Sequence, residues 1–341
     1  MNDASGDLAV VTGASGHIGA NLVRELLARG RRVRVLVHRD TRALSGLAVD
    51  RAEGDLLDPA SLEAAFRGAH TVFHLAAVIS ISGDRDGRVE SANVTGAGNA
   101  AAAARRAGVK RYVHCSSVHA FDLYRGAGAV DETSQRATRP DAFSYDRSKH
   151  RGELEVRREI ERGLAAVIVN PTGVMGPFDF GPSRLGRVLL DLHHHRLPSL
   201  VYGAFDFVDV RDVALSMLAA ETKGRVGENY LLGGHRHTVP ELGAIATAVT
   251  GVKCPALTVP RWLAKAGVPF ALAWGHLVGR EPLFTFESLD TLGLLRAIDT
   301  SKARAELGHE PRPLEDTVRD AYRWFVQAGV LPEGALKGPR A

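Results

Sequence analysis

Near its amino end the chain carries a glycine-rich turn between an apolar run and a run with helical spacing. Residues 8–12 predict a short strand, the turn reads GASGHIG over 13–19, and the helical pattern of 18–29 stops at Gly30. Glycines at such a turn let the backbone approach a pyrophosphate, which the N–H groups at the helix start can bind. A tight turn without a ligand is the alternative. The flanking strand and helix favour dinucleotide binding.

Short β-rich runs and helical runs alternate through the first half of the chain. The alternation predicts a parallel sheet, and the continuously apolar strands suit a sheet covered on both faces. We therefore expect an α/β fold with a doubly wound parallel Rossmann sheet. The expected strands are 8–12, 33–38, 71–75, 111–116 and 165–170, and the expected helices are 18–29, 59–67, 92–107 and 144–162.

The pattern changes after Asn170. Proline and glycine cluster at 171–182, and the C-terminal third is helical and interrupted by prolines. One more strand–helix pair is expected at 205–210 and 211–220, followed by a last strand at 229–232. We therefore expect a Rossmann domain and a smaller, mainly helical substrate-binding cap. The Rossmann domain would comprise 1–172 and 204–232, and the cap would comprise 173–203 and 233–335.

The end of the second expected strand bears on the choice between NADP(H) and NAD(H). Sites that select NAD usually place an acid there, whereas an arginine accommodates a 2′-phosphate. This chain has His38 and Arg39 at that place, and its first acid is Asp40. We expect NADP(H) to be favoured. NAD(H) is the alternative, with Asp40 on the ribose and Arg39 as a solvated loop residue.

Tyr145 and Lys149 lie four residues apart on an expected helix and therefore share one face. The ammonium is expected to lower the pKa of the phenol, which makes the pair a proton donor and acceptor. Ser116 and Ser117 follow the fourth strand, at the edge where doubly wound sheets bind ligands. A hydroxyl there can hold a substrate carbonyl. An exposed helix pair is the alternative, and the order of glycine turn, serines and Tyr–Lys helix favours catalysis.

Together these motifs resemble those of the extended short-chain dehydrogenase/reductase family, also known as the NAD-dependent epimerase/dehydratase superfamily. Within it the chain is similar to dihydroflavonol-reductase-like and hopanoid-associated epimerase-like members. The matching segments span nearly the whole chain: TGASGHIG at 12–19, GDLLD at 54–58, FHLAA at 73–77, NVTG at 93–96, YVHCSSV at 112–118, YDRSK at 145–149, NPTGVMGP at 170–177, FVDVRDVA at 207–214 and LGHEPRPLEDTVRDAYRWF at 307–325.

The resemblance implies roles for individual residues. Ser117, Tyr145 and Lys149 match the catalytic residues of the family. Asp55 and Leu56 are expected beside the adenine. The full set expected at the cofactor is Gly13, Ser15, Gly16, His17, Ile18, His38, Arg39, Asp55, Leu56, Leu75, Ala76, Ala77, Ser116, Tyr145, Lys149 and Pro171.

These residues lead us to expect an oxidoreductase that transfers a hydride between NAD(P) and a carbonyl or alcohol substrate. One alternative is a nucleotide-sugar epimerase or dehydratase with a retained cofactor. Many sugar-nucleotide members of the family carry an asparagine before the Gly–Pro pair, where this chain has Gly173. Another alternative is a non-catalytic NADP(H) sensor. The intact catalytic set argues against a sensor.

Composition argues against several other classes of protein. The net charge is only +4, and arginines are scattered among acids, so we expect no nucleic-acid partner. Cys115 and Cys254 are isolated, and the amino end lacks the features of a signal peptide, which is typical of a cytoplasmic protein. The histidine run at 193–195 has no accompanying carboxylate or cysteine pattern, so we expect no metal.

Two expectations concern partners. The apolar stretch 266–279 is shorter than the roughly 20 residues that span a bilayer. We interpret it as a buried or interface helix and do not expect membrane contact, which is the minority alternative. By the same family resemblance we expect a homodimer formed through the helices at 92–107 and 144–162, with a monomer as the alternative.

Overall fold

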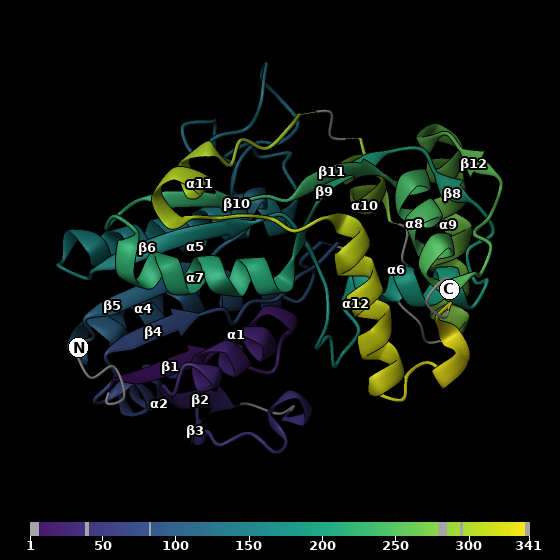
Figure 1. The fold of residues 1–341 in the computed structure, drawn as a ribbon. Coiled ribbons are helices and arrows are strands. Elements are labelled where there is room, and N and C mark those ends of the chain that lie inside the picture. Colours follow the sequence, from purple (N-terminus) through teal and green to yellow (C-terminus); the bar gives the residue numbers. More distant parts are fainter. Residues whose placement is uncertain (1–6, 38–40, 82, 279–284, 294–295, 338–341) are drawn as a thin grey trace.

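The computed structural model describes residues 7–37, 41–81, 83–278, 285–293 and 296–337, with 271–278 described by their backbone alone. Seven parallel strands form its central sheet, in the order β10-β6-β5-β4-β1-β2-β3 (Figure 1). This confirms the doubly wound parallel sheet. The strands are β1 (Leu8–Thr12), β2 (Arg32–Val37), β3 (Asp50–Glu53), β4 (Thr71–His74), β5 (Arg111–Cys115), β6 (Ala166–Pro171) and β10 (Asn229–Leu232).

Helices cover both faces of this sheet because its strands are apolar on both sides. One face packs against α1 (His17–Ala28), α7 (Val210–Lys223) and α11 (Ser301–Leu307). The other face packs against α2 (Pro59–Phe66), α4 (Gly96–Arg106) and α5 (Ser144–Glu161). α11 therefore packs on the Rossmann sheet, although its residues were expected in the cap.

The helix expected at 92–107 is longer and less regular than its pattern indicated. It begins with α3 (Arg88–Glu90), continues through a π-helical turn at Ser91–Thr95 and ends as α4. Such turns often lie at functional sites, because the extra residue redirects side chains. Here the π turn carries Asn93 towards α5.

The expected strand–helix pair is present as β9 (Ala204–Asp209) and α7 (Val210–Lys223), but β9 lies outside the seven-stranded sheet, although its residues were expected in the Rossmann domain. β9 pairs with β7 (Gly173–Met175) and β11 (His235–Thr238) in a separate three-stranded sheet. Asp206 on β9 accepts hydrogen bonds from Thr172 Oγ1 at 2.6 Å and from the Gly234 nitrogen at 2.7 Å. These bonds anchor β9 beside the ends of β6 and β10, while α7 still packs on α1.

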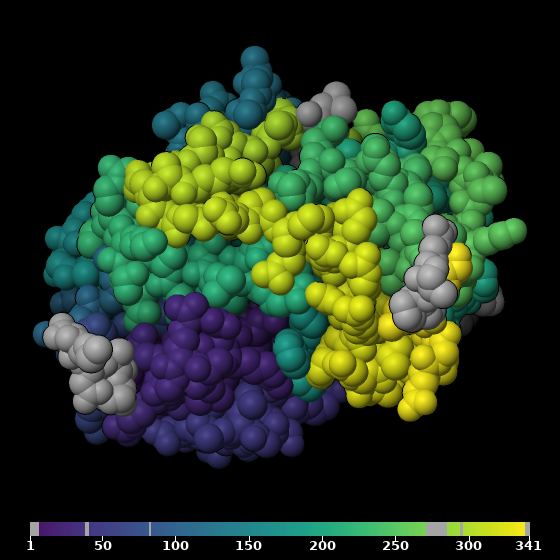
Figure 2. Space-filling model, in the orientation of Figure 1, coloured from purple at the N-terminus to yellow at the C-terminus, as the bar shows by residue number. Residues whose placement is uncertain are grey.

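A second group of helices, which we call the cap, packs beside the Rossmann sheet and consists of α6 (Arg184–His193), α8 (Val239–Thr250), α9 (Arg261–Val278), α10 (Phe286–Thr291) and α12 (Leu314–Gln327). A two-stranded sheet of β8 (Leu200–Val201) and β12 (Thr258–Val259) lies among them, and short 3-10 turns occur at 42–44, 118–120 and 333–335. The chain from α11 to α12 crosses the front of the molecule from the Rossmann half to the cap (Figure 2). The cap core is formed mainly by α6, α8 and α12.

Two sequence expectations about the cap can be compared with the structure. The histidine run ends α6, where the His193 ring packs 6.2 Å from that of Tyr322. Among the described residues, no three or more histidine, cysteine, aspartate or glutamate side chains are grouped so that they could hold a metal ion. The start of the stretch expected to form a buried or interface helix has both kinds of side chain, since Val268 is 1% exposed and Phe270 is 79% exposed.

Candidate active site

The turn between β1 and α1 is shaped for close approach of the backbone. Gly13 has a φ of +68°, and a Cβ atom there would lie 2.6 Å from the nitrogen of Ala76. A Cβ atom at Gly19 would lie 2.2 Å from the Gly13 oxygen. Gly16 precedes α1 and has no side chain to cap it. The first N–H groups of α1 are therefore suited to bind a phosphate.

The segment after β4 lies directly against this turn. Thr12 Oγ1 accepts hydrogen bonds from the nitrogens of Leu75 and Ala76 at 3.2 and 3.3 Å, and lies 2.8 Å from His74 Nδ1. These bonds hold the ends of β1 and β4 side by side. The fold thus has at this turn the close backbone approach that a dinucleotide site requires, with glycine where a side chain would collide with Ala76.

Of the residues expected at the two ends of the cofactor, some are described by the structure and others lie outside the described residues. Asp55 and Leu56 follow β3, and Asp55 Oδ1 accepts a hydrogen bond from the Leu57 nitrogen at 2.9 Å. Pro171 ends β6. His38 and Arg39 lie outside the described residues.

His17 has a second role that the sequence did not indicate. Its Nε2 lies 3.1 Å from the Pro177 oxygen, and Asn21 Nδ2 donates to the same oxygen at 2.9 Å. The side chain of His17 therefore links α1 to the segment after β7. Only its backbone stands in the glycine-rich turn.

Ser117 and Tyr145 meet at the carboxyl end of the sheet. The two hydroxyls form a hydrogen bond, although 28 residues separate them in the sequence. The strand end is fixed because the Ser116 nitrogen donates to the Val169 oxygen of β6 at 2.8 Å. Ser116 Oγ is buried and has no hydrogen-bond partner among the described residues, which leaves it open to a ligand.

Lys149 lies one turn after Tyr145 on α5 and is buried. Its Nζ donates to the Cys115 oxygen at 3.3 Å. The position of α5 is set by the π turn, because Asn93 Nδ2 donates to Ser148 Oγ at 3.0 Å. A Cβ atom at Gly152 would lie 2.2 Å from the Asn93 oxygen, so this close helix contact requires glycine.

The electrostatics of the Tyr145–Lys149 pair differ from the sequence expectation. Burial raises the pKa of Tyr145, and the hydrogen bond with Ser117 acts in the opposite direction. Burial also lowers the pKa of Lys149. The expected lowering of the phenol pKa by the ammonium is corrected, because both groups are desolvated and Nζ points to the Cys115 carbonyl.

A buried carboxylate that sequence reasoning missed holds this constellation together. Glu153 on α5 is 1% exposed. Its Oε1 accepts from Asn170 Nδ2 at 2.7 Å, and its Oε2 accepts from Arg136 Nη1 at 3.0 Å and from Asn229 Nδ2 at 2.9 Å. Asn170 Nδ2 also donates to the Ser117 oxygen at 2.9 Å. The network connects the backbone of Ser117 to α5.

A second group missed from the sequence lies on the cap side of Tyr145. His119 Nδ1 lies 2.8 Å from Asp146 Oδ1, and the His119 ring packs edge-on against the Tyr145 ring with centroids 5.5 Å apart. Burial raises the pKa of Glu287 on α10 to about 7, and the negative charge of Asp146 contributes to the same shift. The sequence signal was only that His119 lies two positions after Ser117 and that Asp146 directly follows Tyr145.

Comparison with known proteins agrees with this geometry. Residues 9–233 match the model of the NAD dependent epimerase/dehydratase family. The chain is 40% identical to sterol demethylase protein B of Methylococcus capsulatus, over 94% of this chain and 99% of that one. It is 33% identical to a putative dihydroflavonol 4-reductase of Synechocystis, over 96% and 97% of the two chains.

A solved structure shows the same fold. The crystal structure of gox2253 has a TM-score of 0.81 and 36% identity, and covers 95% of this chain and 99% of that one. The glycine turn at Gly13, the Ser117–Tyr145 hydrogen bond and the similarity to these proteins all indicate the same family. The chain therefore belongs to the NAD-dependent epimerase/dehydratase family of the extended short-chain dehydrogenase/reductase superfamily.

Proposed function

We propose that this protein is an NAD(P)-dependent carbonyl reductase or alcohol dehydrogenase. The observation that carries the proposal is the hydrogen-bonded pair of Ser117 and Tyr145 at the sheet edge, one helix turn from Lys149. When bound, the nicotinamide exchanges a hydride with the carbonyl carbon of the substrate. Tyr145 passes a proton to or from the substrate oxygen, and Ser117 holds that oxygen.

Lys149 and the glycine turn have supporting roles in this proposal. Lys149 is buried beside Cys115, where its ammonium would hydrogen-bond the nicotinamide ribose. Gly13, Gly16 and the start of α1 would bind the pyrophosphate, with Leu75 and Ala76 lining the cleft. The ring of His119 packs against Tyr145 and would restrict the orientation of the phenol. The named relatives, a sterol demethylase and a dihydroflavonol reductase, favour a lipophilic ring compound as substrate.

A nucleotide-sugar substrate is less well supported because of the space around Gly173. A Cβ atom there would lie 2.5 Å from Phe205 Cε1 and 2.9 Å from the Asp206 oxygen. No asparagine fits at this position without displacing β9. The contact expected for many sugar-nucleotide enzymes therefore has no counterpart, which favours the reductase.

The proposed cofactor is NADP(H), because Arg39 stands where a 2′-phosphate is expected. We expect Arg39→Ala to weaken NADP(H) binding by about 1.5–3 kcal/mol, the cost of one charge-assisted hydrogen bond, and to leave NAD(H) binding unchanged. Fluorescence titration of both cofactors against parent and variant measures this. An unchanged ratio of the two affinities would show that Arg39 does not read the phosphate. The homodimer through α4 and α5 also stays a prediction.

An absorbance assay tests the proposed reaction. The protein is incubated with NADPH or NADH and a panel of hydrophobic ketones and aldehydes, and separately with sugar nucleotides. Loss of reduced cofactor equal to the alcohol formed supports a reductase. Interconversion of sugar nucleotides with no net change in cofactor would establish the epimerase instead, and cofactor binding without turnover of any substrate would support a sensor.

A further inference from the structure

At residues 261–270, where the side chains of α9 are described, the outward face of the helix is largely apolar, which reverses the usual arrangement of a surface helix. Trp262 and Phe270 lie two turns apart and are 72% and 79% exposed, and Leu263 beside them is 46% exposed. The inward side of the helix includes Val268, which is 1% exposed and packs against Leu289 of α10. The fold therefore buries a small side chain and exposes the aromatic ones.

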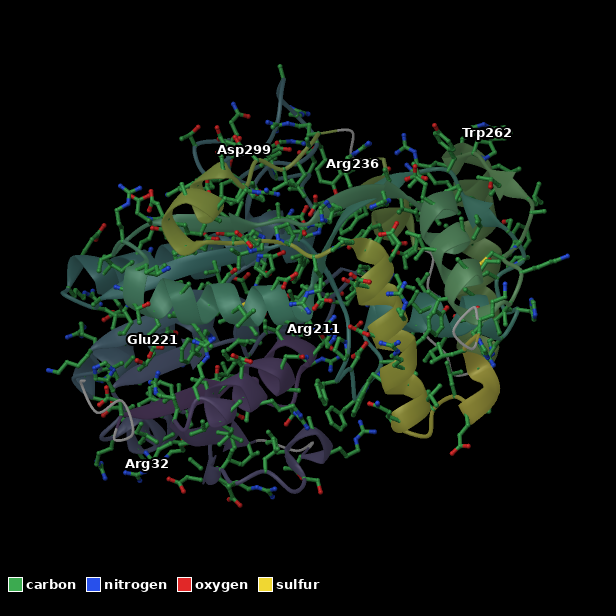
Figure 3. All side chains as sticks on the ribbon, viewed as in Figure 1. Arg32, Arg211, Glu221, Arg236, Trp262 and Asp299 are labelled. Atoms are coloured by element: carbon green, nitrogen blue, oxygen red, sulfur yellow. The ribbon has the colours of Figure 1, made fainter. Side chains whose placement is uncertain are left out.

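Residues from the small β8–β12 sheet extend this apolar face. Tyr202 and Leu257 are 66% and 61% exposed. The Tyr202 nitrogen donates to the Val259 oxygen at 2.9 Å, which holds the segment after β8 against β12, just before α9. Trp262 stands at the outer edge of the cap, at the end of the molecule away from the Rossmann sheet (Figure 3). We define the α9 face as Tyr202, Leu257, Trp262, Leu263 and Phe270.

The segment that carries most of the α9 face is basic, and its nearest acidic partner in the structure is Asp290 of α10. No aspartate or glutamate occurs between Leu242 and Arg280 in the sequence, whereas Lys253, Arg261 and Lys265 lie within that stretch. Lys265 pairs with Asp290 on α10. Lys253 is exposed, and Arg261 is partly exposed. An exposed face that is apolar, aromatic and flanked by cations suits a bilayer surface containing anionic lipid.

We infer that the α9 face docks the enzyme on an anionic membrane surface. None of the described helices is long and apolar enough to cross a membrane, so α9 would lie in the interface. A second copy of this chain is a poorer occupant, because it would present the same positive charge. The inference does not depend on the proposed reaction, although a lipophilic substrate would be concentrated at the same surface.

The position of α9 relative to the candidate active site fits this inference. α9 packs on α10, where Thr291 Oγ1 lies 3.4 Å from the Tyr124 hydroxyl. Thr285, just before α10, donates to the Ile81 oxygen at 2.9 Å. Ile79 and Phe286 nearby are also exposed, at 63% and 47%. A docked α9 would therefore lie one helix away from residues that border the catalytic segment.

Vesicle co-sedimentation of the full chain tests the inference. The probes are phosphatidylcholine vesicles with and without phosphatidylglycerol. We expect binding to the anionic vesicles, weakened by salt, and a fall in apparent affinity of roughly tenfold or more in a Trp262→Ser, Phe270→Ser double variant. The matched control is Leu215→Ser with Val226→Ser, which removes two exposed apolar side chains, 39% and 50% exposed, from the Rossmann half. The control should bind like the parent.

Folding and self-association are checked on the same samples. Both double variants should keep the parent's thermal unfolding midpoint, because the changed side chains are exposed. Failure of the folded parent to sediment with either kind of vesicle would overturn the inference. So would a parent dimer that the Trp262→Ser, Phe270→Ser variant converts to a monomer while vesicle binding stays absent. Vesicle binding requires no turnover, so these outcomes are independent of whether the proposed reductase activity is found.

Discussion

The active-site region of the Rossmann half and the α9 edge of the cap differ in which side chains they bury and which they expose. In the Rossmann half, β1 and β6 are buried along their whole length, and the charged Glu153 is buried within a hydrogen-bonded network. In the cap, α9 exposes Trp262 and Phe270, and the ion pair of Lys265 with Asp290 is open to solvent. The comparison indicates that the Rossmann half holds the candidate catalytic side chains in fixed positions. The α9 edge of the cap instead has an exposed apolar surface that suits an external partner.

The sharpest way to test the comparison is to remove one phenol hydroxyl from each half. Tyr145→Phe should lower kcat by roughly 10²–10⁴-fold while cofactor binding stays nearly intact, because the hydroxyl is the proposed proton-transfer group. Tyr202→Phe on the α9 face should leave kcat unchanged. Steady-state kinetics and cofactor titration provide both readouts. Equal kcat in parent and Tyr145→Phe would remove Tyr145 from the mechanism.

The next comparison sets a buried charge against an exposed one. Glu153→Gln leaves Arg136 without its ionic partner and should lower the free energy of unfolding by about 3 kcal/mol, the lower end for buried pairs, because Arg136 is partly exposed. Lys265→Gln breaks a pair whose side chains are 36% exposed and should cost less than about 1 kcal/mol. Urea unfolding measures both values. Equal costs would contradict the contrast between the halves.

Two glycine substitutions should have effects of opposite sign. Gly13→Ala places a side chain at φ +68° and against the Ala76 nitrogen, so it should cost about 1–3 kcal/mol and abolish cofactor binding. Gly267→Ala in α9 meets no atom within 4 Å and should stabilise the protein by about 0.5–1 kcal/mol. Thermal unfolding with and without cofactor measures these changes. A stabilised Gly13→Ala variant that binds cofactor would refute the proposed cofactor site at this turn.

A further predicted difference between the halves concerns pH. Burial, with a smaller contribution from Lys149, lowers the pKa of His74 from 6.5 to about 3, so the unfolded chain binds this proton first. Stability due to His74 is therefore lost as pH falls from about 6.5 towards 3. Burial, and then Asp146, raise the pKa of Glu287 from 4.5 to about 7, so the folded chain binds this proton first. Stability due to Glu287 is lost as pH rises from about 4.5 to 7.

Urea midpoints between pH 4 and 8 separate these two effects. Compared with His74→Asn, the parent should lose more stability towards low pH. Compared with Glu287→Gln, the parent should lose more stability towards high pH. Parallel pH profiles for the parent and either variant would show that the substituted group does not titrate differently on folding.

Elements with a local signal were predicted with nearly correct bounds. The apolar strand at 8–12 matches β1, and the helix expected at 144–162 differs from α5 by one residue. β3 was missed because DRAE at the sheet edge has no apolar pattern. β9 has the pattern of a strand, and its pairing partners are chosen by contacts of Asp206 with residues distant in the sequence.

The sequence by itself determined the glycine-rich turn after β1, the helix that carries Tyr145 and Lys149, and the alternation of strands and helices in the Rossmann half. These depend on residues within a few positions of each other, whose spacing fixes the local backbone and the shared faces. Only the tertiary structure decided that Glu153 anchors Ser117, that His119 and Asp146 border Tyr145, and that the pKa of Tyr145 rises. It also turned the aromatic side of α9 outward. Burial and long-range pairing depend on which distant segments meet, and periodicity within one segment carries no such information.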